Sequence, residues 1–354
     1  MKTVQLPAEW EPQAFVQLTW PHADTDWQPI LQETYECYHH IAREISLREP
    51  LLIVAQHPEE VKEQLADILN ENIHIVRCQN NDTWARDHAF ITVKRITDSP
   101  CSGQPSELVL NDYQFNGWGM KFPANCDNQI NHHIYDSVCQ LYGRHDENRI
   151  NYVNQLDFVL EGGSIESDGC GTLLTTTSCL LAPNRNDRYT QEEIEERLLH
   201  DFGAKRMLWL HHGHLDGDDT DGHIDTLARF CNPDTIAYVR CEDVNDAHYA
   251  SLHLMEEELK TLRTDTGHPY RLIGLPHPTP IYDADGERLP ATYANFLIIN
   301  GAVLYPTYRL SELDQQAAQQ LQKAFPDREM VPIDCSVLIH QHGSLHCCTM
   351  QYPK

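Results

Sequence analysis

The chain has 354 residues, of which 41% are hydrophobic and 22% charged, a composition that suits a globular protein with a substantial core. It carries 53 acidic and 26 basic side chains, and this formal net charge of −27 argues against partners such as nucleic acid or anionic lipid. No apolar run suits a membrane span, and Pro7, Glu9 and Glu11 interrupt the N-terminal segment before a signal-like run develops. We therefore expect a cytoplasmic protein whose acidic surface either keeps it soluble or concentrates small cations near a cleft.

Short apolar, β-branched runs alternate with segments of helical periodicity along the chain. Helices are predicted over residues 29–48, 58–70, 129–142, 190–202, 244–263 and 310–325. Strands are predicted over residues 51–55, 73–77, 89–93, 172–176, 235–239 and 295–300. The segments 97–106 and 276–290 are predicted to be surface loops. The alternation indicates an α/β fold, and the absence of a linker favours one domain over residues 1–354.

The twelve cysteines show no CxxC spacing. Without a secretory signal, a disulfide framework is not expected. Most of these residues should be reduced thiols that pack as small apolar side chains.

Polar clusters lie between the predicted elements. They are "WARD" at 84–87, "FNGWG" at 115–119, "EGGS" at 161–164, "DGDDTDGHID" at 216–225 and "LHCC" at 345–348. Each has a structural alternative: Asp87 as a cap or turn residue, Glu161 as an ion-pair partner of Arg185, and the acidic run as an ordinary loop. Taken one at a time, these residues do not establish a functional site.

Metal binding is an alternative for the acidic and histidine-rich segments. Counted from Asp216, the acidic run begins like a calcium loop, but Asp221 stands where the turn needs glycine and Leu227 where a bidentate glutamate should be. The histidines at positions 211, 212, 214, 223, 340, 342 and 346 form no HExxH or paired CxxC zinc motif. Metal-assisted catalysis therefore stays a minority alternative.

A thiol, imidazoles and several carboxylates together suit one kind of ligand. A neighbouring imidazole can hold a thiol as the nucleophilic thiolate, whereas neighbouring carboxylates raise the thiol pKa. A site with all these groups needs a cationic ligand, and guanidinium is the planar cation that paired carboxylates bind best. The terminal cysteines would then face an electrophilic carbon.

Five motifs, in order, resemble the agmatine deiminase and bacterial-type peptidylarginine deiminase family within the guanidino-group-modifying superfamily. They are "WARD", "FNGWG", "LEGGSIESDGCGTLLTTTSCLLAPNRN", "DDTDGHIDTLARF" and "LHCCTMQ". The resemblance begins at "PAEWEPQ" and extends to the last residues, so it covers essentially the whole chain. It implies a five-bladed, pseudo-symmetric α/β propeller of ββαβ units, with neither a metal nor an organic cofactor.

The resemblance also assigns roles to residues of the matched motifs. It implies that Cys347 is the nucleophile, that Asp87 and Asp225 clamp the guanidinium, and that Glu161 and His223 complete binding and proton transfer. Trp84 of the first motif is assigned to substrate binding. The family's cysteine falls on Cys347, so Cys348 is expected to be a packed thiol and His346 to orient the loop.

The function implied is hydrolysis of a small cationic guanidine through a covalent thiouronium adduct on cysteine. Agmatine, giving N-carbamoylputrescine and ammonia for polyamine biosynthesis, is the leading substrate. A peptidylarginine deiminase, a deiminase of another small guanidino compound and a silent guanidine-binding protein are the alternatives. The oligomeric state is left open, a homo-oligomer included.

The chain differs from agmatine deiminases close to the implied site. It has His88, Ala89 and Phe90 where Thr-Gly-Pro is common, and Thr177 where glutamate is usual. It reads Gln341, His342 and Gly343 where a glycine triplet is common. These differences leave the five implied catalytic residues intact. They lie close enough to the implied site to affect which substrate tail it accepts.

Overall fold

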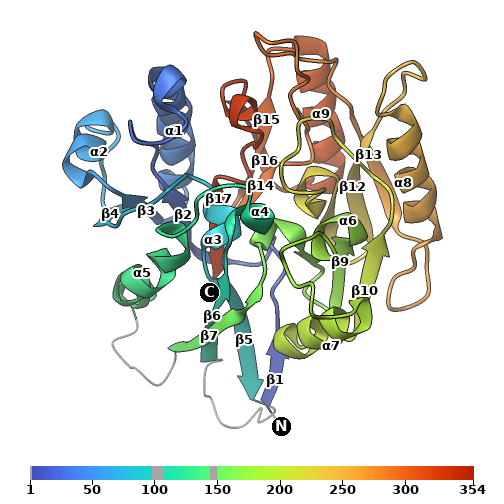
Figure 1. Cartoon of the computed structure of the whole chain (residues 1–354), viewed down its shortest axis with the longest axis horizontal. Helices are drawn as coiled ribbons and strands as arrows, with labels where there is room; N and C mark the ends of the chain where they lie inside the picture. Colours follow the sequence, from blue (N-terminus) through green and yellow to red (C-terminus); the bar gives the residue numbers. More distant parts are fainter. Residues whose placement is uncertain (1, 98–106, 144–149) are drawn as a thin grey trace.

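A computed structural model of the chain describes residues 2–97, 107–143 and 150–354, so nearly all of the predicted loop at 97–106 lies outside the described residues. The strands form five separate sheets, and the longer helices lie toward the outside of the molecule (Figure 1). The α/β class predicted from the alternating pattern is confirmed.

Every sheet contains one ββαβ unit, in which an antiparallel strand pair is followed by a helix and by a third strand parallel to the second. Four units follow one another along the chain. The first is β5 (Ile91–Thr97), β6 (Glu107–Gln114), α5 (Asp127–Leu141) and β7 (Ile150–Val159). The second is β8 (Glu166–Ser167), β9 (Thr172–Thr176), α7 (Gln191–Phe202) and β10 (Arg206–Leu210). The third is β11 (Ala228–Asn232), β12 (Thr235–Arg240), α8 (Tyr249–Thr261) and β13 (Arg271–Pro276). The fourth is β14 (Leu297–Ile299), β15 (Ala302–Thr307), α9 (Ser311–Ala324) and β16 (Glu329–Asp334).

The fifth unit joins the two ends of the chain. It consists of β17 (Thr349–Pro353), β2 (Gln13–Thr19), α1 (Leu31–Ser46) and β3 (Leu51–Ala55). Strand β17 pairs antiparallel with β2, and the buried ring of Tyr352 stacks on Phe15 with ring centroids 4.3 Å apart. The C-terminal segment is therefore fixed in a sheet, which allows the residues just before it to hold a defined geometry.

The remaining elements extend these sheets or connect them. Strand β1 (Lys2–Gln5) adds to β5, and α2 (Pro58–Gln64) leads to β4 (Ile73–Arg77) beside β3. The short helices are α3 (Ala85–His88), α4 (Gly117–Met120) and α6 (Thr177–Leu180). The single-turn 3₁₀ helices are η1 (Gln28–Ile30), η2 (Gly162–Ser164), η3 (Ile224–Thr226) and η4 (Leu338–Gln341).

All six predicted helices and all six predicted strands are present, with differences at their ends. Helix α8 begins at Tyr249 rather than at residue 244, because Asp246 accepts the backbone N–H of His248 in a turn before the helix. The strand predicted at 89–93 runs from Ile91 to Thr97, since the preceding residues form α3. The loop predicted at 276–290 contains no named strand or helix after Pro276, and its middle part, residues 279–288, is exposed or half-buried throughout.

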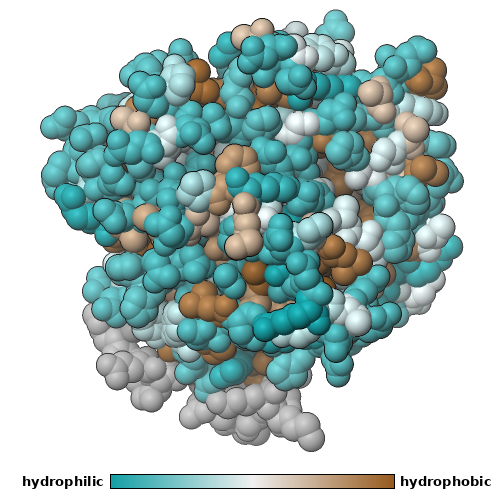
Figure 2. Space-filling view, viewed as in Figure 1, coloured by the Kyte–Doolittle hydropathy of each residue, from teal (hydrophilic) through white to brown (hydrophobic). Residues whose placement is uncertain are grey.

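On the face seen in Figure 2, hydrophilic residues cover most of the surface, and apolar residues appear only in small patches. Among the described residues, none of the helices combines the length and the apolar character needed to cross a bilayer. The eleven cysteines of the described segments are all free, and eight of them are buried. The expectation of reduced, mostly packed thiols is confirmed for this part of the chain.

Candidate active site

The predicted site residues lie in turns and short helices beside the ends of strands. Asp87 is in α3 before β5, and Glu161 lies between β7 and η2. His223 precedes η3, Asp225 lies within it, and Cys347 is two residues before β17. Four separate segments of the chain thus supply these five side chains, since His223 and Asp225 share one turn, and all five side chains are buried.

Gly163 shows how closely three of these side chains approach one another. A Cβ atom on Gly163 would lie 2.6 Å from His223 Nδ1, 2.9 Å from Asp87 Oδ1 and 3.2 Å from Asp225 Oδ2. Any larger residue would displace these groups, so the second glycine of "EGGS" is needed for close approach. The structure therefore brings three of the predicted side chains to one point.

Cys347 is 5% exposed and lies against an amide and a carboxylate. Its Sγ is 3.3 Å from Asn295 Oδ1 and 3.9 Å from Asp225 Oδ2. Burial, followed by the negative charges of Asp225 and Asp87, raises the pKa of Cys347 well above its ordinary value. The free protein should therefore hold Cys347 as a thiol until positive charge enters the site.

The neighbouring cysteine, Cys348, is fully buried in the apolar core. Burial raises the pKa of Cys348 well above its ordinary value, and its thiol lies against the hydroxyl of Tyr38. The prediction of a packed thiol is confirmed.

Asp225 belongs to a buried network of charged side chains. Its Oδ2 is 2.7 Å from His346 Nδ1, and His346 Nε2 is 2.7 Å from Glu9 Oε2. Arg229 donates to Glu9 and to Glu166. Although burial alone would raise it, the pKa of Asp225 is lowered by the hydrogen bond and charge of His346. Oδ1 of Asp225 is buried without a partner among the described residues and can accept a hydrogen bond from a ligand.

Asp87 is held by two donors. Trp118 Nε1 donates to its Oδ2 at 2.9 Å, and the backbone N–H of Gly163 donates to its Oδ1 at 3.1 Å. Burial raises the pKa of Asp87, and the nearby charge of His223 partly counteracts this effect. The carboxylate is thus oriented before any ligand arrives.

Glu161 forms the ion pair with Arg185 that the sequence offered as a structural alternative. Arg185 Nε lies 2.9 Å from Oε1 and 3.2 Å from Oε2, and both side chains are buried. Arg185 also donates to Asp221 Oδ2 at 2.6 Å, which links Glu161 to the acidic segment. The ion pair fixes the orientation of Glu161 beside the other predicted residues.

His223 is fully buried, and its Nδ1 is 3.6 Å from Asp87 Oδ1. Burial opposes its charged form, yet Asp87, then the neighbouring Cys179 and then Glu161 raise the pKa of His223 well above its ordinary value. An imidazolium at this position can donate a proton. Neither ring nitrogen has a hydrogen-bond partner within the described chain.

A cavity reaches Cys347 and Asp87. Its other lining residues are Asp26, Asp82, Trp84, Trp118, Phe122, Asp219, Thr220, Gln341, His342 and Gly343. Carboxylates and aromatic rings together suit an organic cation. The cavity therefore contains Trp84 and the three positions at which a glycine triplet was expected.

The acidic run at 216–225 folds into a hydrogen-bonded turn. Asp218 accepts from the backbone N–H groups of Thr220 and Gly222 at 3.1 and 2.6 Å, and Asp221 pairs with Arg185 and Lys121. This turn precedes His223, so these carboxylates help to position the site.

Comparison with known proteins agrees with these motifs. The sequence model of Porphyromonas-type peptidyl-arginine deiminases matches residues 5–353. The chain belongs to this family. An agmatine deiminase from Pseudomonas syringae pv. tomato is 31% identical over 371 residues, covering 98% of this chain and 95% of that protein.

Solved structures of similar proteins cover nearly the whole chain. A Porphyromonas gingivalis protein, provisionally named an arginine deiminase, has 49% identity and a TM-score of 0.90, over 99% of this chain and 98% of its own. The agmatine deiminase of C. jejuni, solved as a cysteine-to-serine variant with substrate bound, has 36% identity and a TM-score of 0.87, over 100% of this chain and 97% of its own. The family resemblance predicted from the motifs is confirmed.

Two residues that contact the predicted site residues, Asn295 and Trp118, were not predicted from the sequence. Asn295 is the first residue of "NFLIIN", and its side chain accepts from the backbone N–H of His346 and Cys347 at 2.8 and 3.2 Å. The polar side chain of Asn295 at the start of an apolar run was the feature of the sequence that could have indicated its role. Trp118 lay in a cluster already noted, but nothing in the sequence indicated that its indole would bind Asp87.

Proposed function

We propose that this protein hydrolyses agmatine to N-carbamoylputrescine and ammonia in a single catalytic domain. The observation that carries the proposal is the position of the Cys347 thiol at an acidic, aromatic cavity, 3.9 Å from the Asp225 carboxylate. A guanidinium bound by Asp87 and Asp225 would put its central carbon in front of the sulfur.

In the first half of the reaction, the bound cation offsets the carboxylate charges and lowers the pKa of Cys347, so that a thiolate forms. The thiolate attacks the guanidinium carbon and forms a C–S bond. His223 gives a proton to the departing nitrogen, the C–N bond breaks, and ammonia leaves. A thiouronium adduct on Cys347 remains.

In the second half, His223 accepts a proton from water as that water attacks the thiouronium carbon. The C–S bond then breaks, the sulfur leaves as thiolate, and the ureido product departs. Glu161, fixed by Arg185, and Asp87, fixed by Trp118, hold the reacting carbon in place throughout.

The choice of agmatine rests on the cavity and on the relatives. The cavity is lined by the carboxylates of Asp26, Asp82 and Asp219, which would favour a substrate whose tail ends in an ammonium group. Relatives of similar length are named agmatine deiminases. In this proposal the enzyme is cytoplasmic and its product enters polyamine biosynthesis.

The five ββαβ sheets would form the blades of a propeller around the site. Support comes from the pairing of β17 with β2, since a unit made from both chain ends can close a ring of repeats. In this arrangement the turns that hold the five predicted residues would face a common centre.

The test is mass spectrometry of the protein and its products after incubation with agmatine, for wild type and for Cys347→Ala. We expect N-carbamoylputrescine from wild type only, and an adduct on Cys347 after rapid acid quench. Product formation by Cys347→Ala would overturn the role of the cysteine.

A peptidylarginine substrate is the second candidate, because the matching family is described by that activity. Incubation with an arginine-containing peptide separates the two candidates. Turnover of the peptide and not of agmatine would keep the chemistry and replace the substrate.

A further inference from the structure

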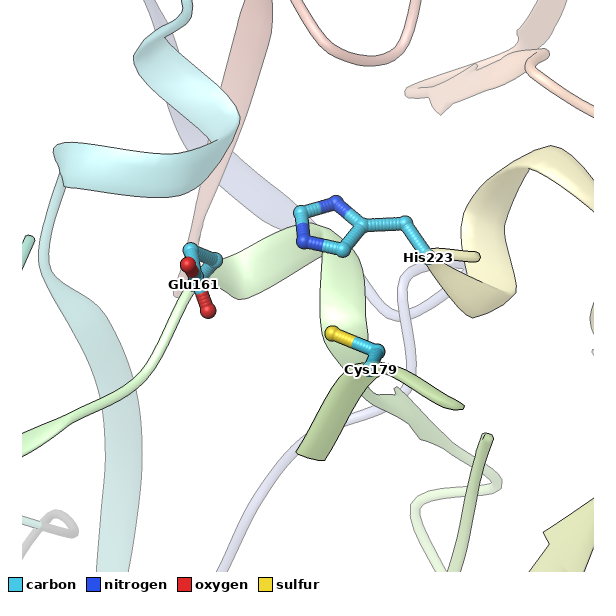
Figure 3. A group of neighbouring side chains, drawn as sticks. All are labelled: Glu161, Cys179 and His223. Atoms are coloured by element: carbon cyan, nitrogen blue, oxygen red, sulfur yellow. The ribbon is translucent and has the colours of Figure 1, made fainter. Parts of the chain in front are cut away.

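A buried thiol outside the proposed reaction lies beside two residues of the site. Cys179 is fully buried in α6, and the side chains of Glu161 and His223 converge on it from separate turns (Figure 3). The carboxylate oxygen, Sγ and ring nitrogen all lie within 4.8 Å of one another.

We propose that Glu161, Cys179 and His223 bind Zn²⁺, and that the occupied site is an inhibited state of the protein. Carboxylate, thiolate and imidazole are the three ligand types that zinc takes in proteins. Ligand atoms in a tetrahedral zinc site lie about 3.3–3.8 Å apart, so a small inward movement of the side chains would complete the site.

Two further groups of potential ligands occur among the described residues, and each of their histidines already uses at least one ring nitrogen in a contact. In one group His346 uses both nitrogens, on Asp225 and Glu9. In the other, His248 accepts the backbone N–H of Asp216 through Nε2 and contacts His277 through Nδ1. His223 differs because both of its nitrogens lack a hydrogen-bond partner within the described residues, so a nitrogen lone pair can become available to a metal.

The position of Cys179 is fixed by the local structure. Its backbone N–H donates to Thr176 Oγ1 at 3.2 Å, and the same hydroxyl donates to the carbonyl of Gly222, next to His223. Thr176 therefore links the segment that carries the Cys179 thiol to the segment that carries the His223 imidazole. Preorganised ligands of this kind favour metal binding.

The charge of Arg185 beside Glu161 does not exclude a cation. Arg185 also pairs with Asp221, and the metal would displace the protons of the Cys179 thiol and the His223 ring into solvent. The thiolate then adds a negative charge to those of Glu161 and Asp87. These charges together can offset both the metal and the guanidinium.

Inhibition follows if the metal engages His223 and Glu161, because neither can then act on a guanidinium; this consequence rests on the proposed function. Zinc binding itself does not depend on that function. The two parts can therefore fail separately.

The test uses Co²⁺ as a spectroscopic probe and Zn²⁺ as competitor, in the Cys347→Ala protein so that the other site thiol cannot contribute. We expect one Co²⁺ per chain with a thiolate charge-transfer band that Zn²⁺ abolishes. Adding Cys179→Ser should remove the band and weaken Zn²⁺ affinity by more than about 100-fold. Cys78→Ser, a buried cysteine outside these clusters, is the matched control and should change neither.

Absence of Co²⁺ binding, or a band that survives Cys179→Ser, would overturn the site. Thermal unfolding of each variant, with Cys179→Ala as a second substitution, identifies a loss of binding that comes from misfolding. Deimination by the Cys347-containing protein is then measured with and without Zn²⁺. Metal binding without any deimination in metal-free buffer would reject the proposed function and leave the site intact.

Discussion

His346 Nδ1 lies 2.7 Å from Asp225 Oδ2, and both side chains are buried. This hydrogen bond lowers the pKa of Asp225, so His346→Ala should raise it and move the acidic limb of the kcat/KM profile to higher pH. The loss of a hydrogen bond to a charged group, about 1.5–3 kcal/mol, predicts a decrease in kcat/KM of about 10- to 150-fold. His346→Asn, whose amide can replace Nδ1 as donor, should recover part of the activity. A pH profile unchanged in His346→Ala would contradict this positioning role.

The carboxylates around Cys347 should suppress its reactivity in the free protein. Since Asp87 contributes to the raised pKa of Cys347, Asp87→Asn should lower that pKa and speed alkylation by iodoacetamide at pH 7. The same variant should deiminate at least about 100-fold more slowly, because half of the guanidinium clamp is lost. Peptide mapping by mass spectrometry measures the modification, with Cys347→Ala as the blank. Slower or equal alkylation in Asp87→Asn would argue against charge control of the thiol.

The buried ion pair of Arg185 and Glu161 should matter for stability as well as for activity. Removing one partner of such a pair leaves an uncompensated buried charge, so Arg185→Gln is expected to lower the free energy of unfolding by about 3–5 kcal/mol. Adding Glu161→Gln should restore part of this loss, because the unpaired charge is then also removed. Urea unfolding of the two single variants and the double variant measures the coupling. Additive effects would mean that the contact contributes little.

Deimination should not require a metal ion, because the proposed nucleophile is a thiol rather than a metal-bound water. Activity measured after dialysis against a chelator should equal that of untreated protein. The activity after dialysis should exceed that of untreated protein if the preparation carries zinc at Glu161, Cys179 and His223. Loss of activity that added Zn²⁺ restores would favour the metallohydrolase alternative.

The hydrophobic pattern of the sequence predicted those strands and helices whose apolar residues match the burial of the element in the fold. Strand β3, "LLIVA", is buried on both faces and reads as a continuous apolar run, so its bounds were predicted correctly. Strand β16 was missed because Pro332 interrupts its short apolar run, and a proline inside a run argues against a strand. Strand β17 pairs with β2 from the other end of the chain, a partnership that no local window contains.

Motif resemblance identified the candidate residues, but the sequence could not give their contacts. The proximity of Asp87 to His223 and Asp225 depends on two turns that are far apart in the chain, and Gly163, which lies between them from a third turn, gave no sign of it beforehand. The Glu161–Arg185 pair was weighed only as a structural alternative to function. In the structure the pair forms part of the site, so the two interpretations are compatible.

His342 stands where a glycine triplet was expected and lines the cavity mouth. It adopts a left-handed conformation with φ of 64°, and its Nδ1 is 2.7 Å from the carbonyl oxygen of Gly217. The side chain thus joins the segment before Cys347 to the acidic turn that carries Asp219. In His342→Gly the backbone keeps this conformation without strain, while the imidazole and its bond across the mouth are lost. We expect kcat for agmatine to change little and the preference for agmatine over an arginine-containing peptide, as a ratio of kcat/KM values, to fall by at least about tenfold. Steady-state kinetics on both substrates measure this ratio, and His342→Asn, which keeps a polar side chain at the same position, is the control. An unchanged ratio in His342→Gly would mean that the mouth is set by other residues, with Phe122 and Gln341 the next to substitute.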